Sequence, residues 1–122
     1  GRVLAVFGCG GDRARGKRPL MGAVAARRAD RVWVTNDNPR SEEPAAIAAA
    51  IVAGAPSTGF EVVLDRRLAI AAAIREAQSG DVVLVAGKGH ETTQTVGARV
   101  LPFDDRVVAR ELLASRAGAG AA

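Results

Sequence analysis

Short apolar runs alternate with longer stretches of helical spacing along the 122 residues of this chain. The apolar runs predict four buried strands, at residues 3–7, 31–35, 60–64 and 82–86. Apolar positions at helical spacing predict the helices between them, at residues 19–29, 44–51 and 66–74. Strands without clean alternation, separated by helices, indicate an α/β fold: a mostly parallel sheet with helices on both faces.

The polar residues between these segments predict where helices begin. Ser41, Glu42 and Glu43 have capping and first-turn chemistry ahead of Pro44, and Asp65 is a suitable N-cap. Weaker strand signals follow at 95–96 and 100–101, and Asp104 is placed to cap a last helix that runs through Leu113. We expect one domain over residues 1–115 and a frayed, Gly/Ala-rich tail over 116–122. Because the first residues already have strand character, we also expect the chain to be a fragment of a longer protein.

The composition of the chain argues against several classes of binding partner. Aromatic residues make up only 3% of the chain, and its basic residues are scattered despite a net charge of +4, so we expect no nucleic-acid partner. No apolar stretch is long enough to span a bilayer and no signal peptide is visible, so we expect no membrane partner. The single Cys9 excludes an internal disulfide and a cysteine-built metal site, and favours a reducing, cytoplasmic location.

Three polar loops follow predicted strands. They are Gly8 to Arg13, Asp37-Asn38-Pro39-Arg40, and Gly87-Lys88-Gly89-His90-Glu91. The carboxyl ends of parallel strands share one edge of a sheet, so we expect the loops to converge there. Arginine matches a carboxylate and Glu matches an ammonium group, so the set Arg13, Asn38, Arg40 and Glu91 fits an amino acid. A plain Asn-Pro turn is the alternative for the second loop.

The basic glycine loop matches neither common nucleotide motif. Arg13 occupies the third glycine position of a dinucleotide fingerprint, and Arg18 stands where a P-loop needs Ser or Thr. Two interpretations stay open: an anion site made by Arg13, Lys17 and the backbone N–H groups at the helix start, or a merely solvated run of charge. His90 is the only histidine, and a structural role suits it better than that of a base. We expect no metal site and no catalytic residue.

The motifs Gly8 to Arg13, Gly16 to Met21, Asp37 to Arg40 and Gly87 to Glu91 together resemble the C-terminal domain of the Mur ligase family, in the branch that adds meso-diaminopimelate. The resemblance covers about Val3 to Leu113 and implies a three-layer, Rossmann-like fold. It also implies that five residues contact meso-diaminopimelate: Arg13, Asn38, Arg40, Gly87 and Glu91. Lys17 would lie towards the ATP phosphates, and Asp37, Pro39, Lys88 and His90 would support the motifs.

The resemblance further implies an ATP-dependent reaction in peptidoglycan precursor synthesis. Its other substrate would be UDP-MurNAc-L-Ala-D-Glu, and the N-terminal UDP-binding and central ATP-binding domains would lie outside this chain. ATP and Mg²⁺ would be bound mainly by the central domain and neither by this domain alone, which we expect to be inactive in isolation. Ala14 departs from the family, which usually has Asp there. The alternative is a stand-alone α/β module that binds a small anion or a nucleotide.

Overall fold

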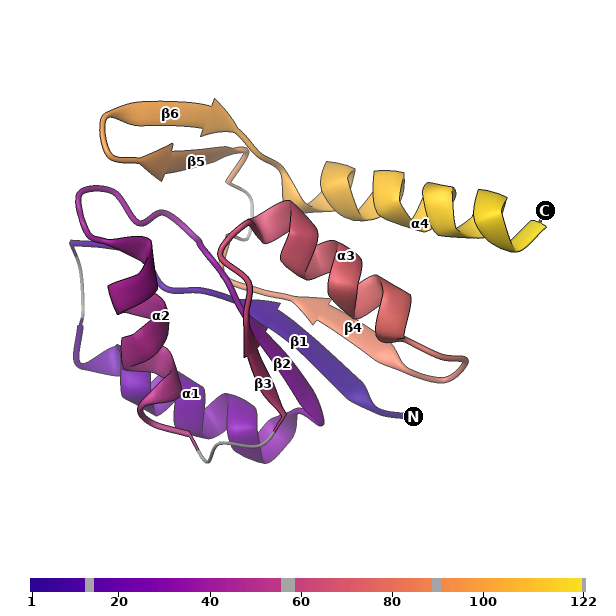
Figure 1. The fold of residues 1–122 in the computed structure, drawn as a ribbon, viewed down its shortest axis with the longest axis horizontal. Helices are drawn as coiled ribbons and strands as arrows, with labels where there is room; N and C mark the ends of the chain where they lie inside the picture. The colour runs from indigo at the N-terminus through magenta and orange to yellow at the C-terminus, as the bar shows by residue number, and fades with distance from the viewer. Residues whose placement is uncertain (13–14, 56–58, 89–90, 122) are drawn as a thin grey trace.

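A four-stranded parallel sheet forms the centre of the structure, a computed structural model that describes residues 1–12, 15–55, 59–88 and 91–121 (Figure 1). Its strands are β1 (Val3–Phe7), β2 (Arg31–Val34), β3 (Phe60–Val62) and β4 (Val82–Val85). They lie in the order β3-β2-β1-β4, and every neighbouring pair is parallel. All four predicted strands and the parallel sheet are confirmed, although β3 ends two residues earlier than predicted.

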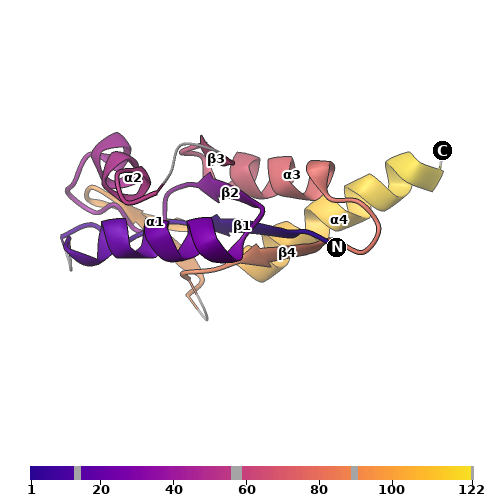
Figure 2. The ribbon, with the colours of Figure 1, turned by 90° about the horizontal axis from the view of Figure 1, so that it is seen from below.

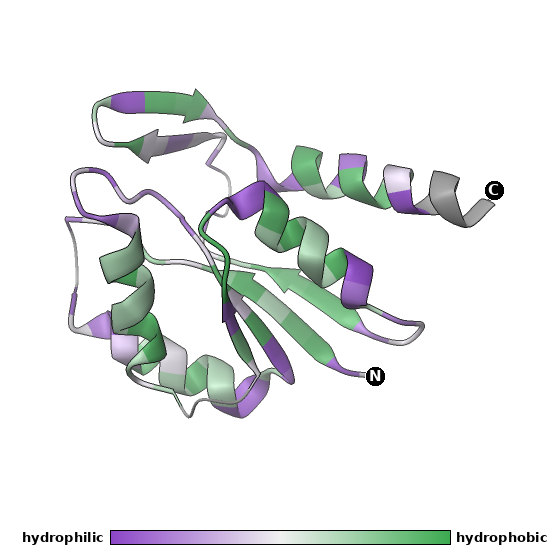
Figure 3. Cartoon of the chain, in the orientation of Figure 1, coloured by the Kyte–Doolittle hydropathy of each residue, from purple (hydrophilic) through white to green (hydrophobic). Residues whose placement is uncertain are grey.

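Helices cover both faces of the sheet, so the predicted three layers are confirmed (Figure 2). The helices are α1 (Lys17–Arg28), α2 (Pro44–Val52), α3 (Arg66–Glu76) and α4 (Asp105–Ala121). Alternate residues of each strand serve opposite faces. Leu4 and Val6 pack with α3 and α4, whereas Ala5 and Phe7 belong to the cluster on the side of α1 and α2. Figure 3 shows the apolar strands at the centre and polar residues on the loops at their ends.

The order of the strands creates a switch point at β1. The chain passes from β1 through α1 to β2 and through α2 to β3, and then returns through α3 to place β4 on the other side of β1. The loops after β1 and β4 therefore leave the sheet in different directions. In open α/β sheets ligands bind at such a point, outside the carboxyl ends of the strands.

The weak strand signals after residue 91 form an antiparallel hairpin of β5 (Thr93–Val96) and β6 (Arg99–Pro102). This hairpin lies apart from the main sheet (Figure 1) and contacts it through the loop after β2, where Arg40 forms a bridge with Val96. The Arg40 amide donates to the carbonyl of Thr95. The hairpin thus braces the loop after β2.

The helix starts confirm two caps and correct a third. The Asp65 side chain accepts from the Leu68 amide, and the Asp104 side chain accepts from the Arg106 amide. Pro44 opens α2 as expected, but the prediction that Ser41 helps to cap this helix was wrong. Its hydroxyl donates to the Asp12 carboxylate 2.7 Å away, a partner that local sequence does not reveal.

The last helix, α4, runs to Ala121 and so includes most of the segment 116–122 that we expect to fray. The fraying itself stays a prediction. Alanine is the strongest helix former, and it alternates with only two glycines after Arg116. No helix of the described residues is long and apolar enough to cross a membrane.

Candidate ligand-binding site

The loops after β1, β2 and β4 meet in a pocket of about 250 Å³ at the carboxyl edge of the sheet. Its lining joins the three loops and the start of α1: Gly8, Cys9, Gly10, Lys17, Met21, Asp37, Asn38, Arg40, Gly87 and Glu91. The predicted convergence of the loops is therefore confirmed. Burial raises the pKa of the Cys9 thiol, which keeps this group neutral rather than nucleophilic.

Asn38 joins the loop after β2 to the loop after β4. Its buried side-chain amide donates to the Glu91 carboxylate at 2.8 Å, and its oxygen accepts from the Thr95 amide at 2.8 Å. Because the oxygen is fixed by a backbone donor, the NH₂ group must face Glu91. The amide therefore orients the Glu91 carboxylate, which is otherwise exposed.

Lys88 and Asp37 form a buried charge pair beneath Asn38. The Lys88 side chain has no exposed surface, and its ammonium group donates to the Thr93 carbonyl at 2.6 Å. It lies 3.5 Å from Asp37 Oδ1, too far for a good hydrogen bond, and that oxygen has no hydrogen-bond partner among the described residues. Burial raises the pKa of Asp37, while the positive charge of Lys88 acts in the opposite direction.

Arg40 lines the pocket in a left-handed backbone conformation, with φ of 53°. A non-glycine residue rarely adopts this conformation, and the hydrogen bonds to Thr95 and from Gly97 hold it there. One guanidinium nitrogen donates to the Gly11 carbonyl at 3.0 Å. The remaining donors of the guanidinium group leave it able to bind a carboxylate.

The glycines of the first loop allow close approach to the loop after β2. A Cβ atom on Gly11 would lie only 1.8 Å from the Pro39 carbonyl oxygen, and the Gly11 amide donates to Asn38 O at 2.7 Å. On the other side of the pocket, Gly87 has φ of 113°, which side chains disfavour. Gly11 therefore serves a close contact between two loops of the site.

The basic run of the first loop divides between a buried and an exposed part. Arg18 is buried and makes a two-pronged pair with Glu42, at 2.8 and 2.9 Å. Hydrogen bonds from Arg18 and from the Asp12 amide lower the pKa of Glu42 to about 2. Lys17, by contrast, is exposed at the start of α1 and lines the pocket. The interpretation of this segment as a solvated run of charge is therefore wrong for Arg18. The anion site at Lys17 stays a prediction.

Four of the positions discussed above, Arg13, Ala14, Gly89 and His90, lie outside the described residues. Of the others, Asn38, Arg40, Gly87, Glu91, Lys17 and Asp37 line the pocket. Pro39 and Lys88 are buried behind it. Analysis of the sequence missed Arg18, Glu42, Arg66 and Asp105, which hold the loops from behind. The only indication of these residues in the sequence is their charge, and charged residues at the surface give the same indication.

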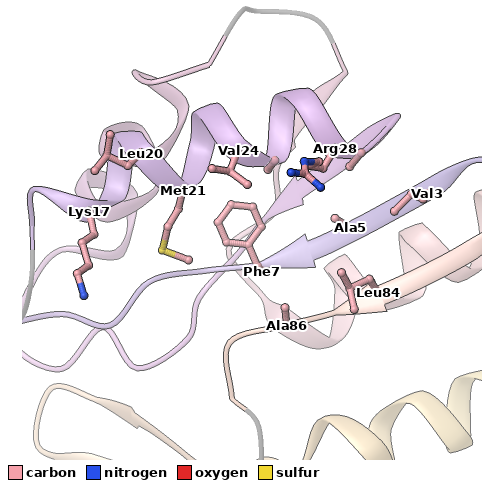
Figure 4. A pocket seen from close by; sticks show the side chains of 12 residues that line it. Val3, Ala5, Phe7, Lys17, Leu20, Met21, Val24, Arg28, Leu84 and Ala86 are labelled. Atoms are coloured by element: carbon pink, nitrogen blue, oxygen red, sulfur yellow. The ribbon is translucent and has the colours of Figure 1, made fainter.

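A second, larger pocket of about 520 Å³ lies beside the first, between α1 and β4 (Figure 4). Phe7, Met21 and Leu84 are among its side chains, and Lys17 stands at its margin (Figure 4). Apart from Lys17 and Arg28, its lining residues are apolar. Its described lining has no carboxylate to pair with an ammonium group, so the smaller pocket, which contains charges of both signs, is the better candidate site.

The smaller pocket combines opposite charges without metal-binding chemistry. Among the described residues, no group of three His, Cys, Asp or Glu side chains could hold a metal ion. The Glu91 carboxylate suits an ammonium group, whereas Arg40 and Lys17 suit anionic groups. A small zwitterion is therefore the ligand that these side chains match.

Comparison with known proteins identifies relatives of the whole chain. The family model described as "Mur ligase, glutamate ligase domain" matches residues 1–89. The chain is 57% identical over 117 residues to the UDP-N-acetylmuramoyl-L-alanyl-D-glutamate–2,6-diaminopimelate ligase of Parasynechococcus marenigrum, covering 95% of this chain and 23% of that protein. It is 60% identical over 115 residues to the ligase of the same name from Prochlorococcus marinus, covering 93% and 23%.

A solved structure of a ligase with the same name superposes with a TM-score of 0.89 at 44% identity, over 94% of this chain and 24% of that chain. The chain thus spans about a quarter of the length of the relatives that it matches.

Proposed function

Since this chain belongs to the Mur ligase family, we propose that it is the part of an ATP-dependent ligase that binds meso-diaminopimelate as the incoming amino acid. The names of its relatives, which include 2,6-diaminopimelate and a UDP-linked dipeptide, support this substrate. The charges of the pocket support it independently, because diaminopimelate carries an ammonium group and a carboxylate at each end.

The ligand would be held by the end that does not react. The Glu91 carboxylate, oriented by Asn38, would accept from the ammonium group of that end. Arg40 would bind the neighbouring carboxylate, with Arg13 as a further donor from the first loop. Gly87 would let the ligand approach the backbone, since it has no side chain. The other amine would then be free to react.

The proposed reaction forms an amide in a peptidoglycan precursor. ATP phosphorylates the γ-carboxylate of the D-glutamate in UDP-MurNAc-L-Ala-D-Glu. The free amine of diaminopimelate then attacks the acyl phosphate, and phosphate leaves as the amide forms and the amine loses a proton. ATP, Mg²⁺ and the UDP-linked dipeptide would be bound by residues outside this chain, with Lys17 as a contact towards the phosphates. The 122 residues alone should therefore be inactive.

One observation carries this proposal. Asn38 links Glu91 to the loop of Arg40, so a carboxylate and a guanidinium group line the same pocket. L-lysine would satisfy Glu91 but has no second carboxylate for Arg40. A charge-assisted hydrogen bond is worth about 1.5–3 kcal/mol, and a polar site rejects an analogue that lacks the matching group by a factor on the order of 10⁴.

The test is a ligation assay on the full-length protein that contains this chain, following phosphate release with UDP-MurNAc-L-Ala-D-Glu and ATP. We expect strong preference for meso-diaminopimelate over L-lysine. Arg40→Ala should lower kcat/KM for diaminopimelate on the order of 100-fold and leave the weak use of lysine unchanged. Arg75→Ala, which removes an exposed arginine from α3, is the matched control and should change neither. Equal use of lysine by the wild type would contradict the proposal.

A stand-alone anion-binding module is the second candidate, and the start of α1 favours it. The N-cap of this helix, Gly16, has no side chain to satisfy the first amides, and the exposed Lys17 follows it. This function predicts that the chain binds inorganic phosphate without any amino acid. Calorimetric titration with phosphate and with diaminopimelate separates the two proposals.

A further inference from the structure

Arg66 is a fully buried arginine behind the site, in the first turn of α3. Its guanidinium group makes a two-pronged pair with the Asp105 carboxylate, with both bonds at 2.7 Å. The same group also donates to two backbone carbonyls, Asn36 O at 2.9 Å and Ala86 O at 3.0 Å. One side chain therefore makes four hydrogen bonds to three separate segments.

The two carbonyls are the last groups before the loops of the site. Asn36 immediately precedes Asp37, and Ala86 immediately precedes Gly87. Strands β2 and β4 are not neighbours, because β1 lies between them in the sheet. Strand β1 pairs with both and so fixes the distance between their ends only indirectly. Arg66 adds a direct link at the base of the two loops, which Asn38 and Glu91 join again nearer the pocket, and Asp105 fixes the guanidinium group from the start of α4.

We propose that Arg66, held by Asp105, is a positioning residue that sets the spacing between the loop carrying Asn38 and Arg40 and the loop carrying Gly87 and Glu91. The inference rests on the proposed function for the identity of the ligand. The planar fork of arginine is required, because a lysine ammonium group cannot reach both carbonyls and both carboxylate oxygens at once. A misplacement of 1 Å in a binding site can lower the rate about 100-fold.

A merely structural role predicts something different. Buried ion pairs often add little net stability, and removing one partner destabilises the whole fold without selecting a site. Arg2 provides the matched control, since it pairs with Asp81 at 2.9 Å and donates to the Glu76 carbonyl at 3.3 Å. That cluster lies at the opposite, amino edge of β1 and β4. Arg2 thus links the end of α3 to the residue before β4, at the other end of the sheet, and its side chain is 40% exposed whereas that of Arg66 has no exposed surface.

The test compares Arg66→Lys with Arg2→Lys in the full-length protein. We expect Arg66→Lys to raise KM for meso-diaminopimelate at least tenfold while KM for ATP changes less than twofold. Arg2→Lys should leave both unchanged. Hydrogen exchange gives a readout without substrate: the amides of Thr95 and Glu91, which bond across and within the loops, should exchange at least tenfold faster in Arg66→Lys only.

Other outcomes decide the question as well. Lower stability in Arg66→Lys with unchanged KM and unchanged exchange at these amides would overturn the proposal and leave an ordinary buried ion pair. If Arg66→Lys does not fold, Asp105→Asn replaces it, because Arg66 then keeps both carbonyls but loses its charged partner. This variant should raise the same KM and the same exchange rates less strongly, and no change in either would overturn the proposal. If the wild type does not depend on diaminopimelate, the proposed function fails, and exchange still decides the role of Arg66.

Discussion

The two neighbouring pockets of this molecule are held together in opposite ways. The pocket at the carboxyl edge is framed by buried polar groups: Asn38 and Arg66 bond across the loops, and Lys88 bonds within the loop after β4. The larger pocket between α1 and β4, called the groove from here on, is mostly apolar. Much of its lining is in contact with solvent: Leu84 keeps 52% of its surface exposed and Leu20 keeps 65%.

The difference shows where each region obtains its order. Loops without a ladder of strand hydrogen bonds need another source of fixed geometry, and buried polar networks supply it when their groups are satisfied. Apolar side chains stabilise the fold when their surface is removed from water, so side chains that stay half exposed add little stability. The site should therefore be sensitive to single polar substitutions, and the groove should tolerate apolar truncation.

The largest effect on stability is expected from Lys88→Met. This change leaves the Asp37 carboxylate buried without its positive partner, and breaking a buried pair costs about 3–5 kcal/mol. Lys17→Met, which removes an exposed lysine from the lining of the pocket that Lys88 lies behind, should change the free energy of unfolding by less than about 0.5 kcal/mol. Urea denaturation measures both.

A second variant tests the cause of that loss. Adding Asp37→Asn to Lys88→Met removes the unpaired charge, so the double variant should be more stable than Lys88→Met alone. If the double variant is equally unstable, the lost interaction is the bond of Lys88 to the Thr93 carbonyl and not the charge pair.

An intermediate effect is expected from truncation of apolar residues on the α1 and α2 side of the sheet. Ile51 is fully buried, and Ile51→Ala should cost about 2–5 kcal/mol through lost burial and the cavity left behind. Leu84→Ala removes a similar side chain from the groove, and should cost less than about 1 kcal/mol because half of that side chain is already in water. Equal losses in thermal or urea denaturation would show that the groove is as well packed as the core.

Local patterns were enough to predict the sheet, two of the helix caps and the convergence of the loops. The apolar runs at Val3 and Val82 and the caps at Asp65 and Asp104 depend only on neighbouring residues, and the parallel sheet then placed Asn38 near Glu91. This contact between residues 53 positions apart follows from topology, not from the residues themselves.

The residues behind the site could not be predicted in this way. Glu42 looked like helix-capping chemistry, but its partner Arg18 lies 24 positions away. Arg66 has no feature in the sequence that separates it from an ordinary arginine at a helix start, and its partner Asp105 lies 39 positions away. Charged residues have the same sequence pattern whether they face water or a partner, so only the packing of loops against helices distinguishes them.

The smallest effect is expected in the pH dependence of stability. The hydrogen bonds from Arg18 and from the Asp12 amide lower the pKa of Glu42 in the folded state to about 2, from an ordinary value of 4.5. Because the folded-state pKa is below the unfolded-state value, the contribution of Glu42 is complete above pH 4.5 and is lost as the pH falls towards 2. Glu42→Gln should therefore flatten the fall of the urea midpoint across this window. Parallel profiles for the wild type and Glu42→Gln would show that the Arg18 pair does not depend on the charge of Glu42.

Asp37 acts with the opposite sign, since burial raises its pKa and its protonation favours the folded state as the pH falls. Asp37→Asn should accordingly make the urea midpoint fall more steeply as the pH is lowered.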